Sequence, residues 1–103
     1  ILDMGHLQNV SVCLDLGHAH IDPGTAEAIA TLGSRIASVH VHDNHGTRDE
    51  HLWPGDGTID WSAVAKALRE LEPPPAAVLE IGYTLNDPPA ILPDRIQKSF
   101  GLL

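Results

Sequence analysis

Six side chains of the types that bind divalent metal ions fall into three short blocks of this sequence. The blocks are LDLGHAH (14–20), VHVHDNHGTRDEHLWPGDG (39–57) and VLEI (78–81). Each block places carboxylates or imidazoles next to a short apolar run, and none contains a cysteine. Oxygen and nitrogen ligands of this kind are typical of catalytic divalent-metal sites. The candidate ligands are Asp15, His18, His40, Asp49, His51 and Glu80.

Taken singly, each candidate also has an ordinary structural interpretation. The Asp and His of the first block could begin a turn and lie in a loop. The His of the second block could lie on the exposed face of a strand, and Asp49 and His51 could be solvated loop residues. Glu80 is the most informative, because a carboxylate between Leu79 and Ile81 is costly in an apolar strand unless it is paired or metal-bound.

The remaining histidines and the single cysteine are less specific. Seven His occur in 103 residues, and five of them lie between His18 and His45. We expect His6 and His20 to be surface or loop residues, and we leave the role of His45 open. Cys13 has apolar neighbours, so we expect it in the core rather than as a nucleophile; alone, it cannot form an intramolecular disulfide.

Three apolar segments are predicted β-strands, at 10–15, 36–42 and 77–81. Along each segment apolar residues alternate with other side chains, and the candidate ligand falls on the face opposite the main aliphatic row. Each ligand also lies near the carboxyl end of its strand. Because parallel α/β folds place their chemistry at that end, we expect Asp15, His40 and Glu80 to converge.

Helices are predicted between and after the strands. The first begins at Asp22-Pro23 and ends at Gly33. The last is expected over 88–100 and is interrupted by Pro93. Residues 43–60 form a loop long enough to indicate a function. Asp60 then caps a helix, in which apolar residues recur at helical spacing: Trp61, Val64, Ala65, Leu68 and Leu71.

The alternation of strand and helix predicts an α/β fold with parallel strands. Three such strands leave two open sheet edges. The chain begins Ile-Leu-Asp, and its first methionine is Met4, so we expect a fragment of a longer protein. Convergence of all six candidates at one sheet edge is better explained by a metal site than by separate accidents.

Composition excludes several classes of function. The formal net charge is −8 with only six Lys and Arg, which argues against nucleic acid as a partner. No apolar run approaches the ~18 residues that a membrane helix needs, and no secretory signal is visible. We therefore expect a cytoplasmic protein that does not enter a membrane.

These blocks resemble the xylose isomerase-like TIM-barrel superfamily. This group includes sugar (phosphate) isomerases and epimerases and the endonuclease IV-type apurinic endonucleases. LDLGHAH resembles its D-x-x-H strand end, and VLEI resembles its metal-binding Glu strand. SVHVHDNHGTRDEHLWPGDGTIDW (38–61) resembles its H-x-x-D, D-x-H and G-[ED]-G-x-[IV]-[DG] run. The resemblance covers about residues 8–85.

The resemblance implies that residues 1–103 are the C-terminal part of a partial TIM (β/α)8 barrel. The three strands look like the fifth, sixth and seventh. Asp15, His40 and Glu80 match ligands used by both branches of the superfamily. His18 matches a zinc ligand of the endonucleases and a substrate-contacting His of several epimerases.

The two branches differ in the long loop. Asp49 and His51 match an extra zinc pair of the endonucleases, although many uncharacterised isomerase-like members also have this D-x-H. Ketose 3-epimerases place a substrate-binding Arg six residues after the strand His, where this chain has Gly46. Arg48 stands two positions later, so the resemblance to those enzymes is incomplete.

The resemblance implies metal-dependent isomerisation or epimerisation of a sugar or sugar phosphate through an enediolate. Glu80 would hold the metal and act as acid or base, and His18 would orient the substrate. Mn²⁺ or Zn²⁺ is favoured, with Mg²⁺ or Co²⁺ as alternatives. The expected partners are the small sugar substrate and either a missing N-terminal half-barrel or a second copy associating through the open sheet edges.

Two other functions stay open. One is zinc-dependent phosphodiester hydrolysis at abasic DNA, as in the endonuclease IV branch, for which Asp49 and His51 would be essential. The acidic balance counts against it, because affinity for duplex DNA depends on Lys and Arg. The other is a non-catalytic barrel fragment, since the earlier strands, and the ligands that they carry in the family, are absent.

Overall fold

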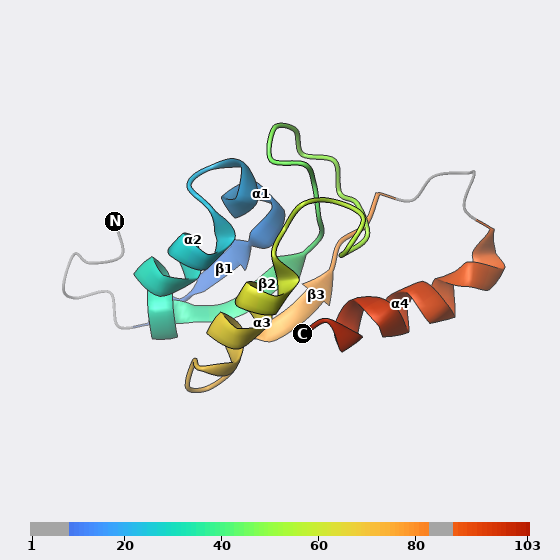
Figure 1. Ribbon diagram of the computed structural model, residues 1–103. Helices are drawn as coiled ribbons and strands as arrows, with labels where there is room; N and C mark the ends of the chain where they lie inside the picture. The colour runs from blue at the N-terminus through green and yellow to red at the C-terminus, as the bar shows by residue number, and fades with distance from the viewer. Residues whose placement is uncertain (1–8, 83–87) are drawn as a thin grey trace.

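A computed structural model describes residues 9–82 and 88–103 of the chain (Figure 1). Its centre is a parallel sheet in the order β1-β2-β3. The prediction for His6 lies outside the described residues. The elements are β1 (Val12–Asp15), α1 (Leu16–Ile21), α2 (Thr25–Leu32), η1 (Gly33–Arg35), β2 (Ile36–Val41), α3 (Trp61–Arg69), β3 (Ala76–Leu79), η2 (Pro89–Ile91) and α4 (Leu92–Gly101).

The core lies on one face of the sheet, beneath α1, α2 and α3 (Figure 1). Leu14, Val39 and Val41 project from the strands into this layer and are buried. They meet apolar residues of the three helices, including Ile29 of α2 and Val64 of α3. The predicted α/β class with three parallel strands is therefore confirmed.

The other face of the sheet is open in the described part of the chain. Val78 is 51% exposed, and Cys13 is exposed as well. The prediction of a core position for Cys13 was wrong. Alternation places it on the face opposite Leu14, and no layer of the described chain covers that face.

Several element boundaries differ from the predicted ones. Helix α1 was not predicted, because its six residues are too few to display a helical repeat. Helix α2 begins at Thr25 rather than at Asp22-Pro23. Pro93 lies in the first turn of α4, so the prediction that it interrupts this helix was wrong; proline is tolerated where no intrahelical N–H is needed.

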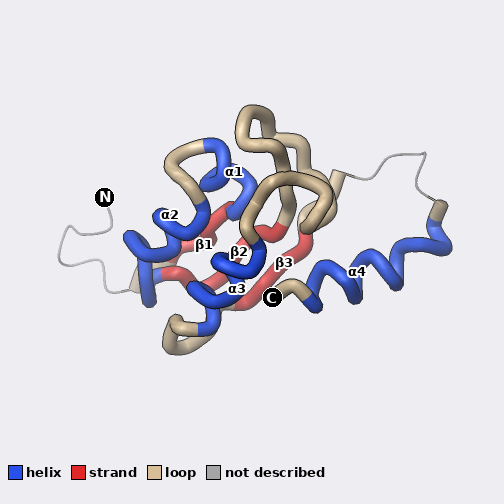
Figure 2. The backbone as a smooth tube through the Cα atoms, viewed as in Figure 1, coloured by secondary structure: helices blue, strands red, loops and turns tan. Residues whose placement is uncertain are grey.

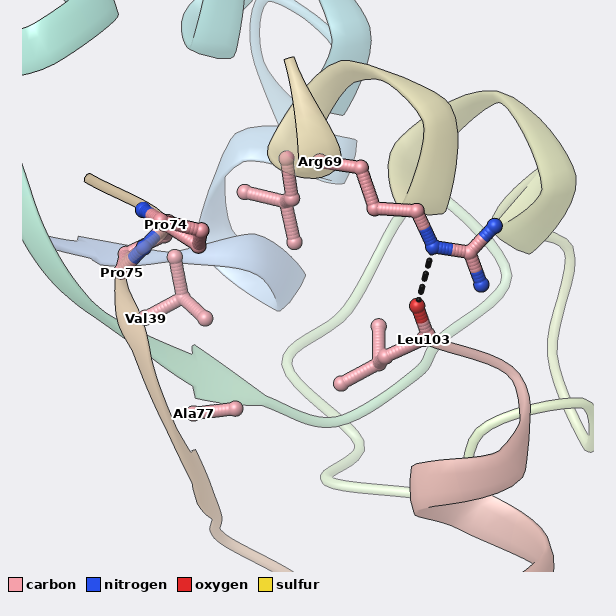
Figure 3. A pocket seen from close by; sticks show the side chains of 7 residues that line it. Val39, Arg69, Pro74, Pro75, Ala77 and Leu103 are labelled. Carbon is pink, nitrogen blue, oxygen red and sulfur yellow. Dashed lines mark hydrogen bonds between the residues drawn. The ribbon is translucent and has the colours of Figure 1, made fainter. Parts of the chain in front are cut away.

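The C-terminus is held beside α3. The Arg69 Nε–H donates to the Leu103 carbonyl over 2.9 Å (Figure 3). Both residues line a largely apolar pocket of about 120 Å³ with Val39 and Ala77. This pocket is lined by none of the six candidate ligands.

The long loop between β2 and α3 is built around the carboxylate of Asp43, which is fully buried. Its Oδ1 accepts hydrogen bonds from the backbone N–H groups of Asn44 and Ile59, at 2.8 and 3.1 Å. Its Oδ2 accepts from the Gly55 N–H at 2.9 Å and from the Trp61 indole N–H at 2.8 Å. These four donors compensate the loss of water around a buried charge.

The rest of the loop packs around this carboxylate. The backbones of Asp43 and Leu52 exchange two hydrogen bonds, of 2.8 and 2.9 Å. Gly57 passes so close that an added Cβ would lie 2.4 Å from the Asp43 Oδ1. Figure 2 shows that the loop stands beyond the carboxyl ends of the strands. It is therefore an ordered structure at the predicted functional edge.

We expect Asp43→Asn to lower the free energy of unfolding by about 2–4 kcal/mol. An amide has only one acceptor oxygen, so buried N–H groups lose their partner, at ~1–3 kcal/mol for each unsatisfied group. Urea unfolding followed by tryptophan fluorescence measures the change. The matched control is Asp60→Asn, because Asp60 accepts one hydrogen bond, from the Ala63 N–H, and Asn caps helices equally well. Equal small losses in both variants would contradict the prediction.

Candidate metal centre

Asp15, His40 and Glu80 form the first of two groups of candidate ligands at the carboxyl edge of the sheet. One ligand atom from each lies within 4.8 Å of the others. The His40 Nδ1 is 2.8 Å from the Glu80 Oε2 and 3.8 Å from the Asp15 Oδ2. The three residues meet as expected. Their role as metal ligands stays a prediction.

Strand register explains this convergence. Asp15 ends β1 and lies directly opposite His40 of β2 in the parallel ladder. β3 ends at Leu79, opposite Val41, so Glu80 comes just after the strand rather than within it. The Glu80 N–H still donates to the Val41 carbonyl over 3.0 Å, which keeps the side chain at the sheet edge.

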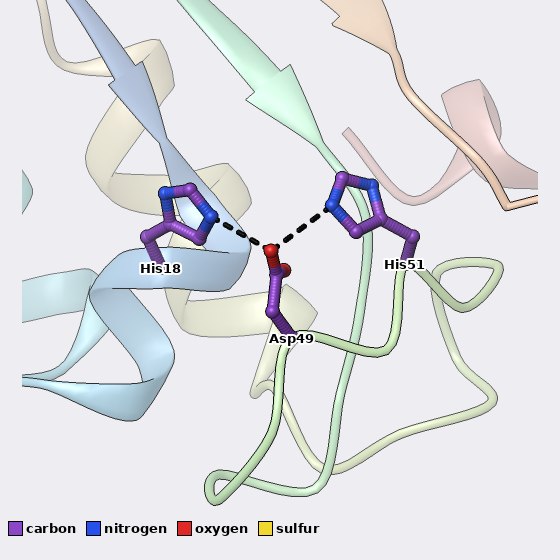
Figure 4. A group of neighbouring side chains, drawn as sticks. All are labelled: His18, Asp49 and His51. Atoms are coloured by element: carbon purple, nitrogen blue, oxygen red, sulfur yellow. Dashed lines mark hydrogen bonds and ion pairs between the residues drawn. The ribbon is translucent and has the colours of Figure 1, made fainter.

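The second group consists of His18, Asp49 and His51 (Figure 4). The Asp49 Oδ2 lies 2.9 Å from the His18 Nε2 and 3.2 Å from the His51 Nε2. His18 belongs to α1, whereas the other two come from the long loop. The His51 Nδ1–H donates to the Glu80 carbonyl over 3.0 Å, which ties this group to the first.

The pKa shifts in the second group favour the protonated form of its two histidines and the ionised form of Asp49. The hydrogen bond to Asp49 is the main cause that raises the pKa of His18 above its usual 6.5. Burial acts to raise the pKa of Asp49, but contacts with His18 and His51 outweigh it and lower that pKa below 3.8. Burial likewise opposes, without cancelling, the contacts with Glu80 and Asp49 that raise the pKa of His51. A cation bound here would have to displace these protons.

The other histidines have different surroundings. His20 is half-buried in α1, and its Nε2 lies 2.8 Å from the Thr58 Oγ1, so it fastens this helix to the long loop. His20 lies in a helix rather than in a loop, and its partly exposed side chain agrees with the expected surface position. His45 is exposed, and its Nδ1 is 2.9 Å from the Glu50 Oε1. That hydrogen bond is the main cause that lowers the pKa of Glu50.

His42 is a residue that the search for ligands passed over. The predicted strand over 36–42 would place His42 on the same face as His40, but β2 ends at Val41. His42 turns inward and is fully buried, with its Nε2 2.7 Å from the Asp15 Oδ1. The signal in the sequence was its position two residues after a candidate ligand, in the pattern His-x-His.

The first group fits a divalent cation in its donor chemistry. Asp15 and Glu80 present two carboxylates around one imidazole, and a bound cation would be attracted to both carboxylates. Mixed carboxylate and imidazole ligands suit a borderline transition metal better than Ca²⁺, which prefers oxygen alone. Both groups lie at the carboxyl edge of the sheet, and their side chains are partly exposed.

Comparison with known proteins shows which family of proteins this chain belongs to. A family described as "Xylose isomerase-like TIM barrel" matches residues 1–99. The uncharacterized protein y4fM of Sinorhizobium fredii is 45% identical over 60 residues, which are 57% of this chain and 19% of that protein. The D-psicose 3-epimerase of Enterocloster bolteae is 32% identical over 73 residues, which are 70% of this chain and 23% of that enzyme.

A solved structure shows the same fold. The crystal structure of a D-tagatose 3-epimerase-like protein superimposes with a TM-score of 0.65 and 29% identity. The likeness covers 90% of this chain and 37% of that protein. The chain thus spans well under half the length of these relatives, and the predicted partial barrel is confirmed.

We expect Asp49→Asn to lower the pKa of His18 toward 6.5 in the metal-free chain, because the main cause of its raised pKa is removed. NMR titration of the histidine ring signals measures this. The matched control is Glu27→Gln, which removes a charge on the exposed surface of α2. An unchanged His18 midpoint in Asp49→Asn would show that the hydrogen bond does not form.

The interaction between His18 and Asp49 should stabilise the fold only within a defined range of pH. A raised His18 pKa contributes stability that is complete below pH 6.5 and is lost as the pH rises through the folded pKa. A lowered Asp49 pKa contributes above pH 3.8 and is lost as the pH falls through its folded value. The stability difference between wild type and Asp49→Asn should therefore be largest between these limits. Solvent screening at these exposed side chains keeps it small.

Proposed function

The chain belongs to the xylose isomerase-like TIM-barrel family, and from that premise we propose that it supplies part of the active site of a metal-dependent sugar isomerase or epimerase. The observation that carries the proposal is the convergence of Asp15, His40 and Glu80 at the carboxyl edge of the sheet. Barrel enzymes place their chemistry at this edge. The relatives named as epimerases favour a ketose, or its phosphate, as the substrate.

Asp15, His40 and Glu80 would hold the ion, with Mn²⁺ or Zn²⁺ favoured and Mg²⁺ or Co²⁺ as alternatives. A divalent ion bound there would supply Lewis-acid stabilisation of the negative charge that develops on the substrate oxygens. Asp15 is suited to hold the ion because its Oδ1 already accepts two hydrogen bonds, while its Oδ2 faces His40.

The proton transfer would fall to Glu80. Its side chain is 46% exposed, and its Oε2 faces His40, 2.8 Å from the Nδ1. A proton taken from the carbon beside the substrate carbonyl leaves an enediolate, and return of the proton to a different face or carbon completes epimerisation or isomerisation. His18 is 60% exposed and would orient a substrate hydroxyl through its ring nitrogen.

A second candidate is phosphodiester hydrolysis at abasic DNA. The observation in its favour is the assembled second group, in which His18 and His51 share the Asp49 carboxylate. The charge of −8 opposes it, because only six Lys and Arg are available to contact phosphates. We therefore place it second. A third, a non-catalytic fragment, follows from the length of chain that the relatives have beyond this one.

We expect the chain to bind Zn²⁺ or Mn²⁺ more tightly than Ca²⁺, and His40→Ala to weaken Zn²⁺ binding at least about tenfold, or ~1.4 kcal/mol. The reason is the loss of an imidazole ligand that the softer ions prefer. Isothermal titration calorimetry measures both. His45→Ala is the matched control, because His45 contacts Glu50 outside either group. Weak binding of all three ions that His40→Ala leaves unchanged would count against the site.

The second group distinguishes the two enzymatic functions. In a complete barrel that contains this chain, Asp49→Ala with His51→Ala should mainly raise KM for a ketose or its phosphate, because the pair only shapes the pocket. In the endonuclease alternative the same change removes two zinc ligands and should abolish cleavage. The assay uses a panel of ketoses and their phosphates beside an abasic-site duplex. Cleavage of the duplex by the parent, lost in the double variant, would overturn the isomerase proposal.

A further inference from the structure

The His42 imidazole is built into the interior between the two groups of ligands. Its side chain is fully buried, and its Nδ1 has no hydrogen-bond partner among the described residues. The ring lies over Gly17, where an added Cβ would come within 2.0 Å of the His42 Cε1. Only glycine at this position admits the ring. Burying a polar atom without a partner is costly, so the ring must contribute something that an apolar side chain would not.

One contribution is to the first group. The His42 Nε2–H donates to the Asp15 Oδ1 over 2.7 Å, because a carboxylate can only accept. The same oxygen accepts the backbone N–H of His18 over 2.9 Å. Two donors thus hold the Oδ1, and the Oδ2 is left pointing toward His40, 3.8 Å from its Nδ1. The donor from His42 therefore selects which carboxylate oxygen is free to bind an ion.

The other contribution is to the second group. The rings of His42 and His51 are stacked, with centroids 3.9 Å apart and planes inclined by 4°. Imidazole lone pairs lie in the ring plane, so two stacked rings cannot direct them at one ion. His42 is therefore not a ligand beside His51. It is the surface against which the His51 ring is held, and its Nδ1 stays 3.9 Å from the Asp49 Oδ1, beyond hydrogen-bond distance.

We propose that His42 is a positioning residue that couples the two groups: its N–H orients Asp15 for the metal ion, and its ring face fixes His51 beside that ion. This inference rests on the metal site of the proposed function. It means that an ion bound by the first group affects His51, and hence the long loop, through the buried His42 ring in addition to the hydrogen bond from His51 to the Glu80 carbonyl.

Two variants separate the two contributions. His42→Gln keeps an N–H at the position of the imidazole Nε2 but has no ring. His42→Phe keeps a ring but has no N–H. Zn²⁺ affinity is measured by calorimetry on the 103-residue chain, and the His51 ring nitrogens are followed by long-range ¹H–¹⁵N NMR during the same titration. Circular dichroism at each titration point reports whether each variant keeps its fold.

The expected result is a crossed pattern. His42→Phe should bind Zn²⁺ about 10–100-fold more weakly, the usual loss when a hydrogen-bond partner of a metal ligand is removed. His42→Gln should stay within about threefold of wild type in Zn²⁺ affinity but show a clearly smaller Zn²⁺-induced shift of the His51 signals, because only the bond to the Glu80 carbonyl still links His51 to the first group. A merely structural role would instead weaken both readouts together in both variants.

The contrary outcomes are distinct. If both variants bind Zn²⁺ and shift His51 as wild type does, or if both fail in both readouts, the coupling by His42 is refuted while the metal site stands. If the wild-type chain shows no saturable Zn²⁺ binding, the metal site of the proposed function is refuted, and the coupling with it.

Discussion

The buried carboxylate of Asp43 is the constraint on which the candidate site depends. A charge removed from water must find hydrogen bonds, and here its four donors come from residues up to 18 positions along the chain. Meeting that requirement folds the loop back on itself and joins its end to the first turn of α3 at Trp61. Asp49 and His51 lie within the segment closed in this way. Their position beside the strand ends therefore follows from the hydrogen bonds that the buried Asp43 carboxylate requires.

The sheet imposes a second constraint, because one of its faces is covered by helices and the other is not. Apolar residues on one face are covered by α1, α2 and α3, and this half supplies the core. The face that carries the first ligand group has no covering layer in the described chain, which leaves Val78 and Cys13 exposed beside it. The D-tagatose 3-epimerase-like structure is longer than this chain, which covers 37% of it. The uncovered apolar surface and the first ligand group therefore lie on the same face, where a complete barrel would have its interior.

Period-two and helical patterns were enough to predict the strands, α3 and the meeting of Asp15, His40 and Glu80, because each depends on local alternation and on the direction of parallel strands. Contacts within the loop were not predictable in this way. The bond from the Trp61 indole to Asp43, and the stacking of His42 on His51, depend on where a long loop closes. His42 was assigned to the face of His40 because alternation was extended one residue past the end of β2. A strand that ends at Val41 frees the next side chain to turn inward.

The D-x-x-H spacing of the first block acquires a physical reason in α1. Asp15 is the N-cap of this helix, and its Oδ1 accepts the backbone N–H of His18, the third residue of the first turn. The spacing of three is thus the spacing of a capping bond, and it places the His18 ring next to the capping carboxylate, with its Nδ1 3.7 Å from the Asp15 Oδ2. One oxygen of Asp15 begins the helix and accepts from His42, while the other faces the ligand group. A single aspartate therefore joins strand, helix and both groups of ligands, which explains why a helix as short as α1 persists at this edge.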